Sequence, residues 1–112
     1  MINAVLKDTI TKKEHDLTAL ISKHKKISVG RAGFGSTIEL GKDVNPYLTQ
    51  RTSKNHATIT YEDPGSFFLY DNSINGTRIN NKRIFSGEKK PLADGDKIWF
   101  ADYGPVVYEE VK

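Results

Sequence analysis

From residue 26 onward, hydrophobic and polar residues alternate in short runs that are separated by turn-forming residues. Alternation with a period of two places the apolar side chains of a strand on one face of a sheet. The predicted strands cover residues 27–29, 38–40, 57–61, 67–70, 84–85, 97–100 and 106–111. Short strands at this spacing predict an all-β fold, a two-sheet antiparallel β-sandwich, rather than a parallel sheet with crossover helices.

The turns between these strands have recognisable sequences. Asp63-Pro64-Gly65 ends one strand, Asn75-Gly76 and Asn80-Asn81 are tight-turn dipeptides, and residues 93–96 form a further turn. Proline fixes φ, whereas glycine and asparagine tolerate positive φ, so these short segments reverse the chain. Residues 67–70 are apolar on both faces, which predicts a central strand.

The amino-terminal leader has a different pattern. Thr11 and Glu14 have the spacing of a capping box, and apolar residues follow them at helical spacing. This pattern predicts a short helix over about 12–24. Because β-branched residues favour strands, the alternative is that residues 4–10 and 17–22 are strands of the sheet that follows.

Charge is distributed unevenly along the chain. The net charge of +3 comes from the first 26 residues, where six lysines outnumber three acidic residues. Residues 27–112 hold 11 basic and 11 acidic residues. A surface that neutralises many phosphates needs a basic body or a dense basic stripe, so the composition disfavours general nucleic-acid binding. Contact of the basic leader with nucleic acid is kept as an alternative, which steep salt dependence would reveal.

Composition also excludes several classes of protein. No apolar run reaches about 18 residues, so no transmembrane helix is predicted, and residues 1–8 lack the apolar stretch of a signal peptide. Without cysteine there is no disulfide, thiol nucleophile or cysteine metal site. We therefore expect no membrane contact and an intracellular location, cytoplasmic or nuclear.

Four short segments lie in order at predicted strand boundaries. They are Gly30-Arg31, Ser53-Lys54-Asn55-His56-Ala57, Asp71-Asn72-Ser73-Ile74-Asn75-Gly76-Thr77 and Leu92-Ala93-Asp94-Gly95-Asp96-Lys97-Ile98. Each segment alone is weak evidence, but the ordered set resembles the forkhead-associated (FHA) domain over roughly residues 26–112. The resemblance implies a β-sandwich whose loops at one end bind phosphothreonine peptides.

Three residues are candidates for binding the phosphate. A phosphate monoester carries close to two negative charges and three acceptor oxygens, so its site needs a fixed cation and converging donors. Arg31 follows a strand, and its planar guanidinium suits phosphate. Ser53 supplies a hydroxyl and Lys54 adds charge from the same loop. The family usually has arginine after this serine, so Lys54 is a departure that supplies a point charge without bidentate geometry.

The resemblance also assigns residues that contact the peptide beside the phosphate. Asn75 matches the family asparagine that hydrogen-bonds the peptide main chain, for which an amide offers both donor and acceptor. Ile74 stands where the family often has serine or threonine, and it cannot donate to the phosphate. Arg51 shares a face with Ser53 if the segment is extended, so it is a candidate for selecting an acidic side chain. Residues 41–52 form a long loop that we expect to influence partner choice.

A catalytic role is disfavoured. His56 lies near Ser53 in the sequence, but side chains at this spacing in an extended segment need not meet. His15 and His24 have no metal-ligand spacing with His56, and residues 30–35 lack the strand and helix context of a nucleotide-binding loop. We expect no catalytic residue, no metal and no cofactor.

In the family, the histidine of the second segment braces the binding loops from beneath, and this role is carried over to His56. Gly30, Gly76 and Thr77 are likewise assigned to loop architecture.

The sequence thus predicts a leader at residues 1–25 and an FHA-type module at residues 26–112. We expect this module to be non-catalytic and to recruit a phosphothreonine-containing partner, either within a larger protein or complex or as a small adaptor. The alternative is an FHA fold used for phosphate-independent protein interaction, which Lys54 and Ile74 favour.

Overall fold

The computed structural model describes residues 2–111, which form eleven strands, one α-helix and one 3-10 helix. The strands are β1 (Ala4–Asp8), β2 (Glu14–Asp16), β3 (Ile27–Arg31), β4 (Ile38–Leu40), β5 (Ala57–Glu62), β6 (Ser66–Asp71), β7 (Thr77–Ile79), β8 (Lys82–Ile84), β9 (Lys89–Pro91), β10 (Lys97–Phe100) and β11 (Tyr103–Glu110). The helices are α1 (Leu17–Lys23) and the 3-10 helix η1 (Pro46–Thr49).

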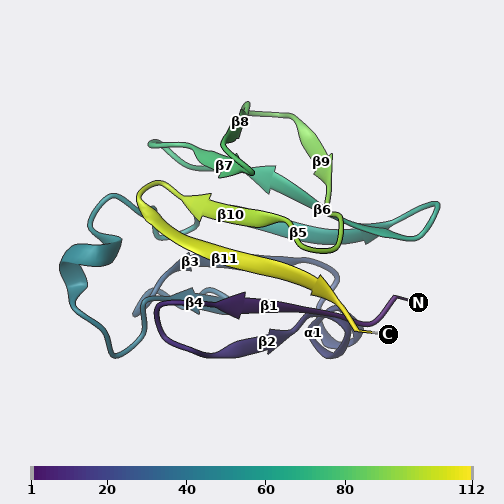
Figure 1. Ribbon diagram of the computed structural model, residues 1–112, viewed down its shortest axis with the longest axis horizontal. Coiled ribbons are helices and arrows are strands. Elements are labelled where there is room, and N and C mark those ends of the chain that lie inside the picture. The colour runs from purple at the N-terminus through teal and green to yellow at the C-terminus, as the bar shows by residue number, and fades with distance from the viewer. Residues whose placement is uncertain (1, 112) are drawn as a thin grey trace.

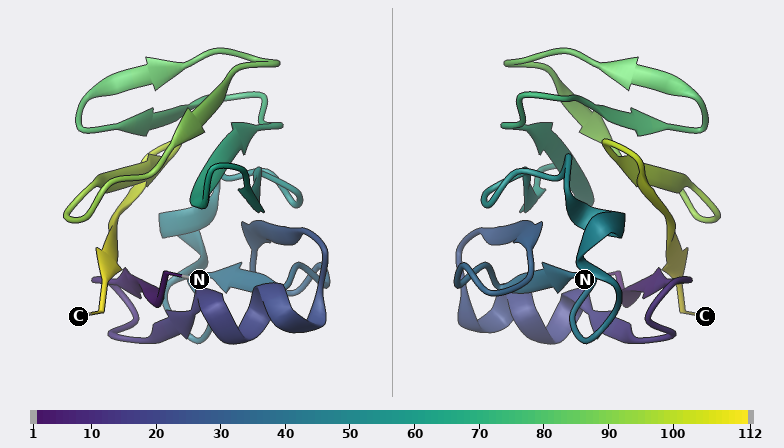
Figure 2. Two further views of the ribbon diagram at one scale, coloured as in Figure 1. Left: turned by 90° about the vertical axis from the view of Figure 1, so that its right-hand side faces the viewer. Right: turned by 90° about the vertical axis from the view of Figure 1, so that its left-hand side faces the viewer.

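These strands form two sheets packed face to face, as Figures 1 and 2 show. One sheet has the order β2-β1-β11-β10-β7-β8 and the other has the order β4-β3-β5-β6-β9. Neighbouring strands are antiparallel except for β3 and β4, which are parallel. The predicted β-sandwich is confirmed. Its four edge strands, β2, β8, β4 and β9, are each three residues long.

The core lies between the sheets and is built from alternate residues of each strand. On β3, Ile27 and Val29 are fully buried, and on β6 Phe67 and Leu69 are fully buried. The prediction that residues 67–70 form an interior strand is confirmed, because β6 lies between β5 and β9. Fully burying a side chain of this kind stabilises the fold by about 1.5–3 kcal/mol, so the two inner faces supply most of the driving force for folding.

The amino-terminal segment contributes to both the sheet and the connection between the sheets. β1 pairs with β11 along its whole length, so the alternative of a strand near the amino terminus is confirmed for residues 4–8. α1 begins at Leu17, where the Asp16 carboxylate caps it by accepting the backbone N–H of Ala19 at 3.0 Å. The helix predicted over 12–24 is therefore shorter than expected, and a strand at 17–22 is wrong.

The helix starts late because Thr11 belongs to a turn instead of a helix cap. The Asp8 carboxylate accepts the backbone N–H groups of Ile10 and Thr11, at 2.9 and 3.1 Å. Lys12 then has a φ of 68°, which ends any helical path at this point. Among the described residues, no helix is long and apolar enough to cross a bilayer.

Three loops meet at one end of the sandwich, on the left in Figure 1, whereas the labelled N and C ends lie on the right. They are the β3–β4 loop (32–37), the β4–β5 segment (41–56) with η1, and the β6–β7 loop (72–76). Backbone hydrogen bonds join them, because Arg31 N–H donates to the Ser53 carbonyl at 3.0 Å and Asn72 N–H donates to the His56 carbonyl at 2.9 Å. This loop end carries every candidate phosphate and peptide residue.

Candidate functional site

Two cations converge on one exposed aromatic ring at the loop end. The guanidinium carbon of Arg31, the last residue of β3, lies 4.9 Å from the centre of the Phe34 ring. The Lys54 ammonium lies 4.7 Å from the same centre. Cations are attracted to the face of an aromatic ring, so Phe34 favours the presence of both cations at this end of the sandwich. Phe34 was not among the residues expected from the sequence, although an aromatic residue between two loop glycines is a usable signal.

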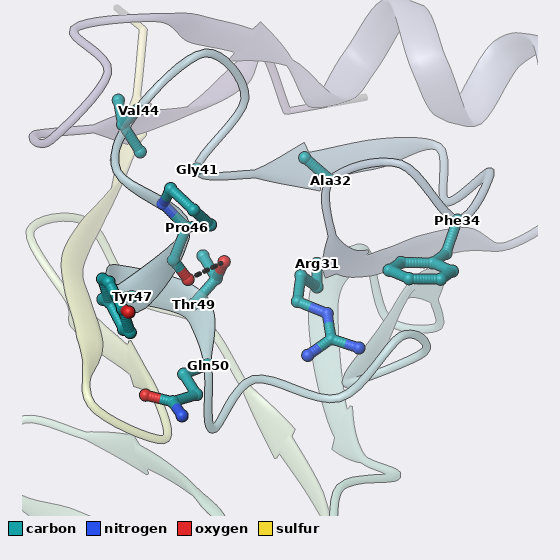
Figure 3. Close-up of a pocket in the computed structure, with 9 residues that line it drawn as sticks. All are labelled: Arg31, Ala32, Phe34, Gly41, Val44, Pro46, Tyr47, Thr49 and Gln50. Carbon is teal, nitrogen blue, oxygen red and sulfur yellow. Dashed lines mark hydrogen bonds between the residues drawn. The ribbon is translucent and has the colours of Figure 1, made fainter.

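Arg31 has unused hydrogen-bonding capacity. Within residues 2–111, its Nε is the one buried side-chain nitrogen or oxygen that has no hydrogen-bond partner. A buried donor left without an acceptor costs free energy until it finds one. Figure 3 shows the guanidinium directed into the open space between Phe34 and Gln50. The terminal nitrogens of the guanidinium, and not the buried Nε, are therefore the donors that an anionic ligand in this space could reach.

Ser53 lies beside this cation and presents a hydroxyl whose hydrogen is free. Its Oγ accepts the Ile74 backbone N–H at 3.3 Å, so the hydroxyl hydrogen can be donated elsewhere. The Ile74 side chain is 88% exposed and does not cover this hydroxyl group. Ile74 thus contributes only its backbone N–H to this part of the site.

His56 is buried beneath the site and joins two of the loops. Its Nδ1 accepts the Ser53 backbone N–H at 3.0 Å, which assigns the ring hydrogen to Nε2 and makes Nε2 the donor to the Gly76 carbonyl at 2.9 Å. The ring also packs edge-on against Phe100. Burial lowers the pKa of His56 more than the Gly76 carbonyl and the Asp71 carboxylate raise it, so the neutral ring is favoured.

The glycine before Arg31 allows the loops to approach closely. A Cβ atom on Gly30 would lie 1.8 Å from the carbonyl oxygen of Lys54, closer than any two such atoms can come. That carbonyl also accepts the Ser36 hydroxyl at 2.9 Å. Gly30 therefore fixes the distance between β3 and the segment that carries Ser53 and Lys54.

The β6–β7 loop is built around Asp71, which the sequence analysis left without a role. Asp71 Oδ1 accepts the backbone N–H of Ser73 at 3.0 Å and the Thr77 hydroxyl at 2.9 Å. The Ser73 hydroxyl oxygen in turn accepts the Gly76 N–H at 2.8 Å, and Gly76 has a φ of 94°, which favours glycine. Thr77 and Gly76 thus shape the loop on which Asn75 is presented.

Asn75 and Arg51 lie at the same end, next to each other. The Asn75 side-chain amide donates to the Arg51 carbonyl at 2.8 Å, which leaves the amide oxygen and one N–H for a ligand. The Arg51 guanidinium lies 3.7 Å from the Asp102 carboxylate in the β10–β11 turn, and both side chains are mostly exposed. The structure therefore brings Arg31, Lys54, Ser53 and Asn75 to one end, with Arg51 paired at its margin.

The fold and this arrangement of loops define a class of protein, a β-sandwich that presents an arginine, a serine and an asparagine on neighbouring loops. The family model of the FHA domain matches residues 27–101, so the chain belongs to the FHA domain family.

Solved structures are similar over nearly the whole chain. The amino-terminal FHA domain of Rad53p from S. cerevisiae, in complex with a phosphothreonine peptide, is 22% identical, with a TM-score of 0.73 over 98% of this chain and 94% of that one. The FHA domain of an Arabidopsis thaliana hypothetical protein is 22% identical, with a TM-score of 0.76 over 100% of this chain and 88% of that one. At these identities the likeness shows the fold alone. No curated protein sequence matches the chain.

Proposed function

We propose that this chain is a non-catalytic FHA module that binds a phosphothreonine-containing segment of a partner protein and so recruits that partner inside the cell. Arg31 and Lys54 neutralise the phosphate, Ser53 donates its hydroxyl to a phosphate oxygen, and Asn75 binds the peptide main chain. The same cluster would serve any protein that a kinase has phosphorylated on a threonine with suitable flanking residues.

The observation that carries this proposal is the state of Arg31. Its guanidinium and the Lys54 ammonium both lie against the Phe34 ring, and its buried Nε has no partner within residues 2–111. Each hydrogen bond to a charged group contributes roughly 1.5–3 kcal/mol. Three such donors from Arg31, Ser53 and Lys54 are enough for a reversible interaction that a phosphatase can end. Among the solved structures of similar fold, several are complexes with phosphothreonine peptides, which supports the assignment.

The arrangement around His56 supports a non-catalytic role. Nδ1 is occupied by the Ser53 backbone N–H, and Nε2 is occupied by the Gly76 carbonyl. A general base needs a free ring nitrogen within reach of the hydroxyl that it deprotonates. Because both ring nitrogens of His56 are engaged with the backbone, the ring is suited to bracing loops rather than to activating Ser53.

The second candidate is phosphate-independent protein binding, which the exposed apolar side chains of the loop end favour. Ile74 and Tyr47 are 88% and 76% exposed. A partner that bound chiefly through these groups would not require phosphate or Arg31. The two candidates therefore differ in one measurable dependence.

The test is binding of a degenerate phosphothreonine peptide library to the wild type and to Arg31→Ala, with the unphosphorylated library beside it. We expect enrichment that needs the phosphate and an affinity loss of at least about 30-fold in Arg31→Ala, because two or more charged hydrogen bonds are removed. Arg78→Ala is the matched control, since Arg78, an exposed arginine of β7, also lies over an aromatic ring, that of Trp99 on β10. A folded Arg31→Ala protein that binds phosphorylated peptides as well as the wild type would contradict the proposal.

A further inference from the structure

A cleft of about 500 Å³ lies on the side of the sandwich where one edge of each sheet comes together, at the top of Figure 1. One wall comes from β8, the edge strand of the six-stranded sheet, and the other comes from β9, the edge strand of the five-stranded sheet. The connection between these two strands, residues 85–88, also lines the cleft. None of the residues assigned to phosphate or peptide binding does so, and the cleft is therefore a separate surface feature.

Apolar and positively charged side chains line this cleft together. Ile84 reaches it from the core, and Phe85 is 67% exposed at its edge. Its basic residues are Lys82, Arg83 and Lys90, and all three are exposed. No ion pair among residues 2–111 includes any of the three. The cleft thus combines unpaired cations with exposed apolar surface.

The two carboxylates that line the cleft are engaged by the protein's own turns. Glu88 Oε1 accepts the Phe85 backbone N–H at 3.3 Å. Asp96 uses one oxygen for the Ala93 backbone N–H at 2.8 Å and the other for the Asn80 side-chain amide at 2.9 Å. Because these oxygens are directed to turn N–H groups, the cations of the cleft are left for an anion from outside the chain.

Both walls of the cleft are held by tight turns. Asn80 and Asn81, between β7 and β8, have φ values of 51° and 69°, which are typical of a two-residue hairpin turn. In the connection to β9, the Glu88 N–H donates to the Phe85 carbonyl at 2.9 Å, and Gly87 has a φ of 83°. These turns position the walls without the help of a ligand.

We propose that this cleft binds an acidic segment of a partner protein, in which carboxylates alternate with apolar side chains, and that it does so without phosphothreonine. Alternate side chains of an extended segment point to opposite sides, and the segment advances about 3.3 Å per residue. Such a segment can turn an apolar side chain towards Phe85 and Ile84 and carboxylates towards the exposed lysines at the rim. The proposal goes beyond phosphothreonine recognition, because it uses none of the residues of that site.

The apolar lining and the charge distribution favour a protein segment over a nucleic acid. A nucleic acid needs a continuous basic path for its phosphates, whereas residues 27–112 hold 11 basic and 11 acidic residues. A phosphate backbone would also leave the exposed Phe85 ring uncovered, since it offers no apolar group to bury. A segment that carries both carboxylates and apolar side chains matches both features of the cleft.

The experiment titrates the whole chain with a fluorescent, unphosphorylated peptide of alternating glutamate and leucine. Lys82→Glu combined with Lys90→Glu is expected to weaken binding by at least about tenfold, because two attractions are replaced by two repulsions. Phe85→Ser is expected to weaken it by about fivefold, because apolar contact area is lost. Binding by the wild type should also weaken as salt is added.

Lys23→Glu combined with Lys25→Glu is the matched control. It reverses the charge of two exposed lysines at the end of α1, across the molecule from β8 and β9 (Figure 1). This control is expected to bind the peptide as the wild type does, and thermal unfolding verifies that every variant folds. Peptides with serine in place of leucine, or lysine in place of glutamate, are each expected to bind at least about fivefold more weakly.

Absence of binding by the wild type would overturn the proposal, and so would equal weakening in the two double variants, which would show an effect of net charge alone. Loss of binding in Arg31→Ala would place the acidic peptide at the phosphate position and overturn it too. Tighter binding of a single-stranded oligonucleotide of equal charge would assign the cleft to nucleic acid instead. Phosphothreonine recognition is measured separately with phosphorylated peptides, and Lys82→Glu combined with Lys90→Glu is expected to leave it unchanged.

Discussion

The loop end has two layers that differ in how their polar groups are used. In the lower layer, His56, Asp71 and Thr77 are buried, and the hydrogen bonds of their side chains are made to neighbouring loops. In the upper layer, the Arg31 guanidinium is directed into open space, and Ser53 retains a hydroxyl hydrogen that no described atom accepts. The polar groups of the lower layer are hydrogen-bonded within the protein, whereas those of the upper layer are available to a ligand.

This difference predicts whether a substitution changes the free energy of unfolding or the affinity for a ligand. A buried polar group whose partner is removed costs stability, because its desolvation is no longer compensated. An exposed donor that faces solvent in the free protein costs little stability when removed, but its contribution to binding is lost. Substitutions in the lower layer should therefore lower the free energy of unfolding, and substitutions in the upper layer should lower affinity.

The largest effect is expected from Gly30→Ala. The added Cβ would overlap the Lys54 carbonyl oxygen, which belongs to backbone and cannot rotate away, so we expect a loss of more than about 4 kcal/mol in the free energy of unfolding. Gly35→Ala is the control, since its Cβ meets no atom within 4 Å and only its φ of 84° is strained. Urea denaturation measures both, and equal losses in the two variants would show that the close approach at Gly30 is unimportant.

His56→Gln should have the next largest effect and lower the free energy of unfolding by about 2 kcal/mol at pH 7.5. The reason is that the Ser53 N–H or the Gly76 carbonyl loses its hydrogen-bond partner. The pH dependence should change as well. Since burial lowers the pKa of His56 in the folded state, the unfolded chain binds the proton at a higher pH, near the ordinary value of about 6.5. The stabilisation is then complete above about pH 7 and falls as the pH is lowered through 6.5 and below.

Denaturation between pH 5 and pH 8 measures this dependence in wild type and in His56→Gln. His15 also has a pKa lowered by burial, so both proteins are best compared in a His15→Gln background. The slope of stability against pH should be smaller in the variant that lacks His56. An unchanged slope would show that His56 does not need to be neutral for the loops to hold their positions.

Ser53→Ala tests the upper layer. We expect about tenfold weaker binding of a phosphothreonine peptide from one lost charged hydrogen bond, with a change in unfolding free energy below about 0.5 kcal/mol. Calorimetric titration and urea denaturation of the same preparation give the two values. If stability falls as much as affinity, Ser53 belongs to the lower layer and the division between layers is wrong.

The smallest effect is expected at the margin, where Arg51 and Asp102 form an exposed ion pair. Exposed pairs contribute little, so releasing Arg51 by Asp102→Asn should raise selection of an acidic flanking residue by no more than about threefold, and less at high salt. Arg51→Ala should abolish that selection. Peptide-library profiles at two salt concentrations test both variants, and identical profiles in all proteins would remove Arg51 from the specificity residues.

Most strands with a buried face could be predicted from the sequence, although β7, which buries Thr77 and Ile79, was missed, and strands without a buried face could not be predicted. Residues 38–40 and 97–100 alternate and were expected where β4 and β10 lie. β9 consists of Lys89, Lys90 and Pro91, all exposed, so its pairing with β6 leaves no trace in the pattern. The start of α1 was missed because hydrogen bonds to Asp8, a residue outside the capping motif, hold Thr11 in a turn.

The residues of the site also fall into two groups, those that the sequence predicted and those that it did not. Arg31, Ser53, Lys54 and Asn75 were expected from ordered motifs, and the structure brings them to one end. Phe34 was missed because its contacts depend on segments that meet only in three dimensions. The β3–β4 loop and the segment that carries Lys54 are separated by the whole of β4, and no local pattern encodes their distance.

The short edge strands described above have a consequence for how this chain meets other chains. An unpaired strand edge invites another chain to add to the sheet, either as a bound peptide or as the start of an aggregate. Here β8 presents Lys82 and Arg83, and β9 presents Lys89 and Lys90 beside a proline that has no N–H to donate. The same edge of a second copy docking on β8 or on β9 would bring like charges together, so extension of either sheet by self-pairing of these two edges is opposed.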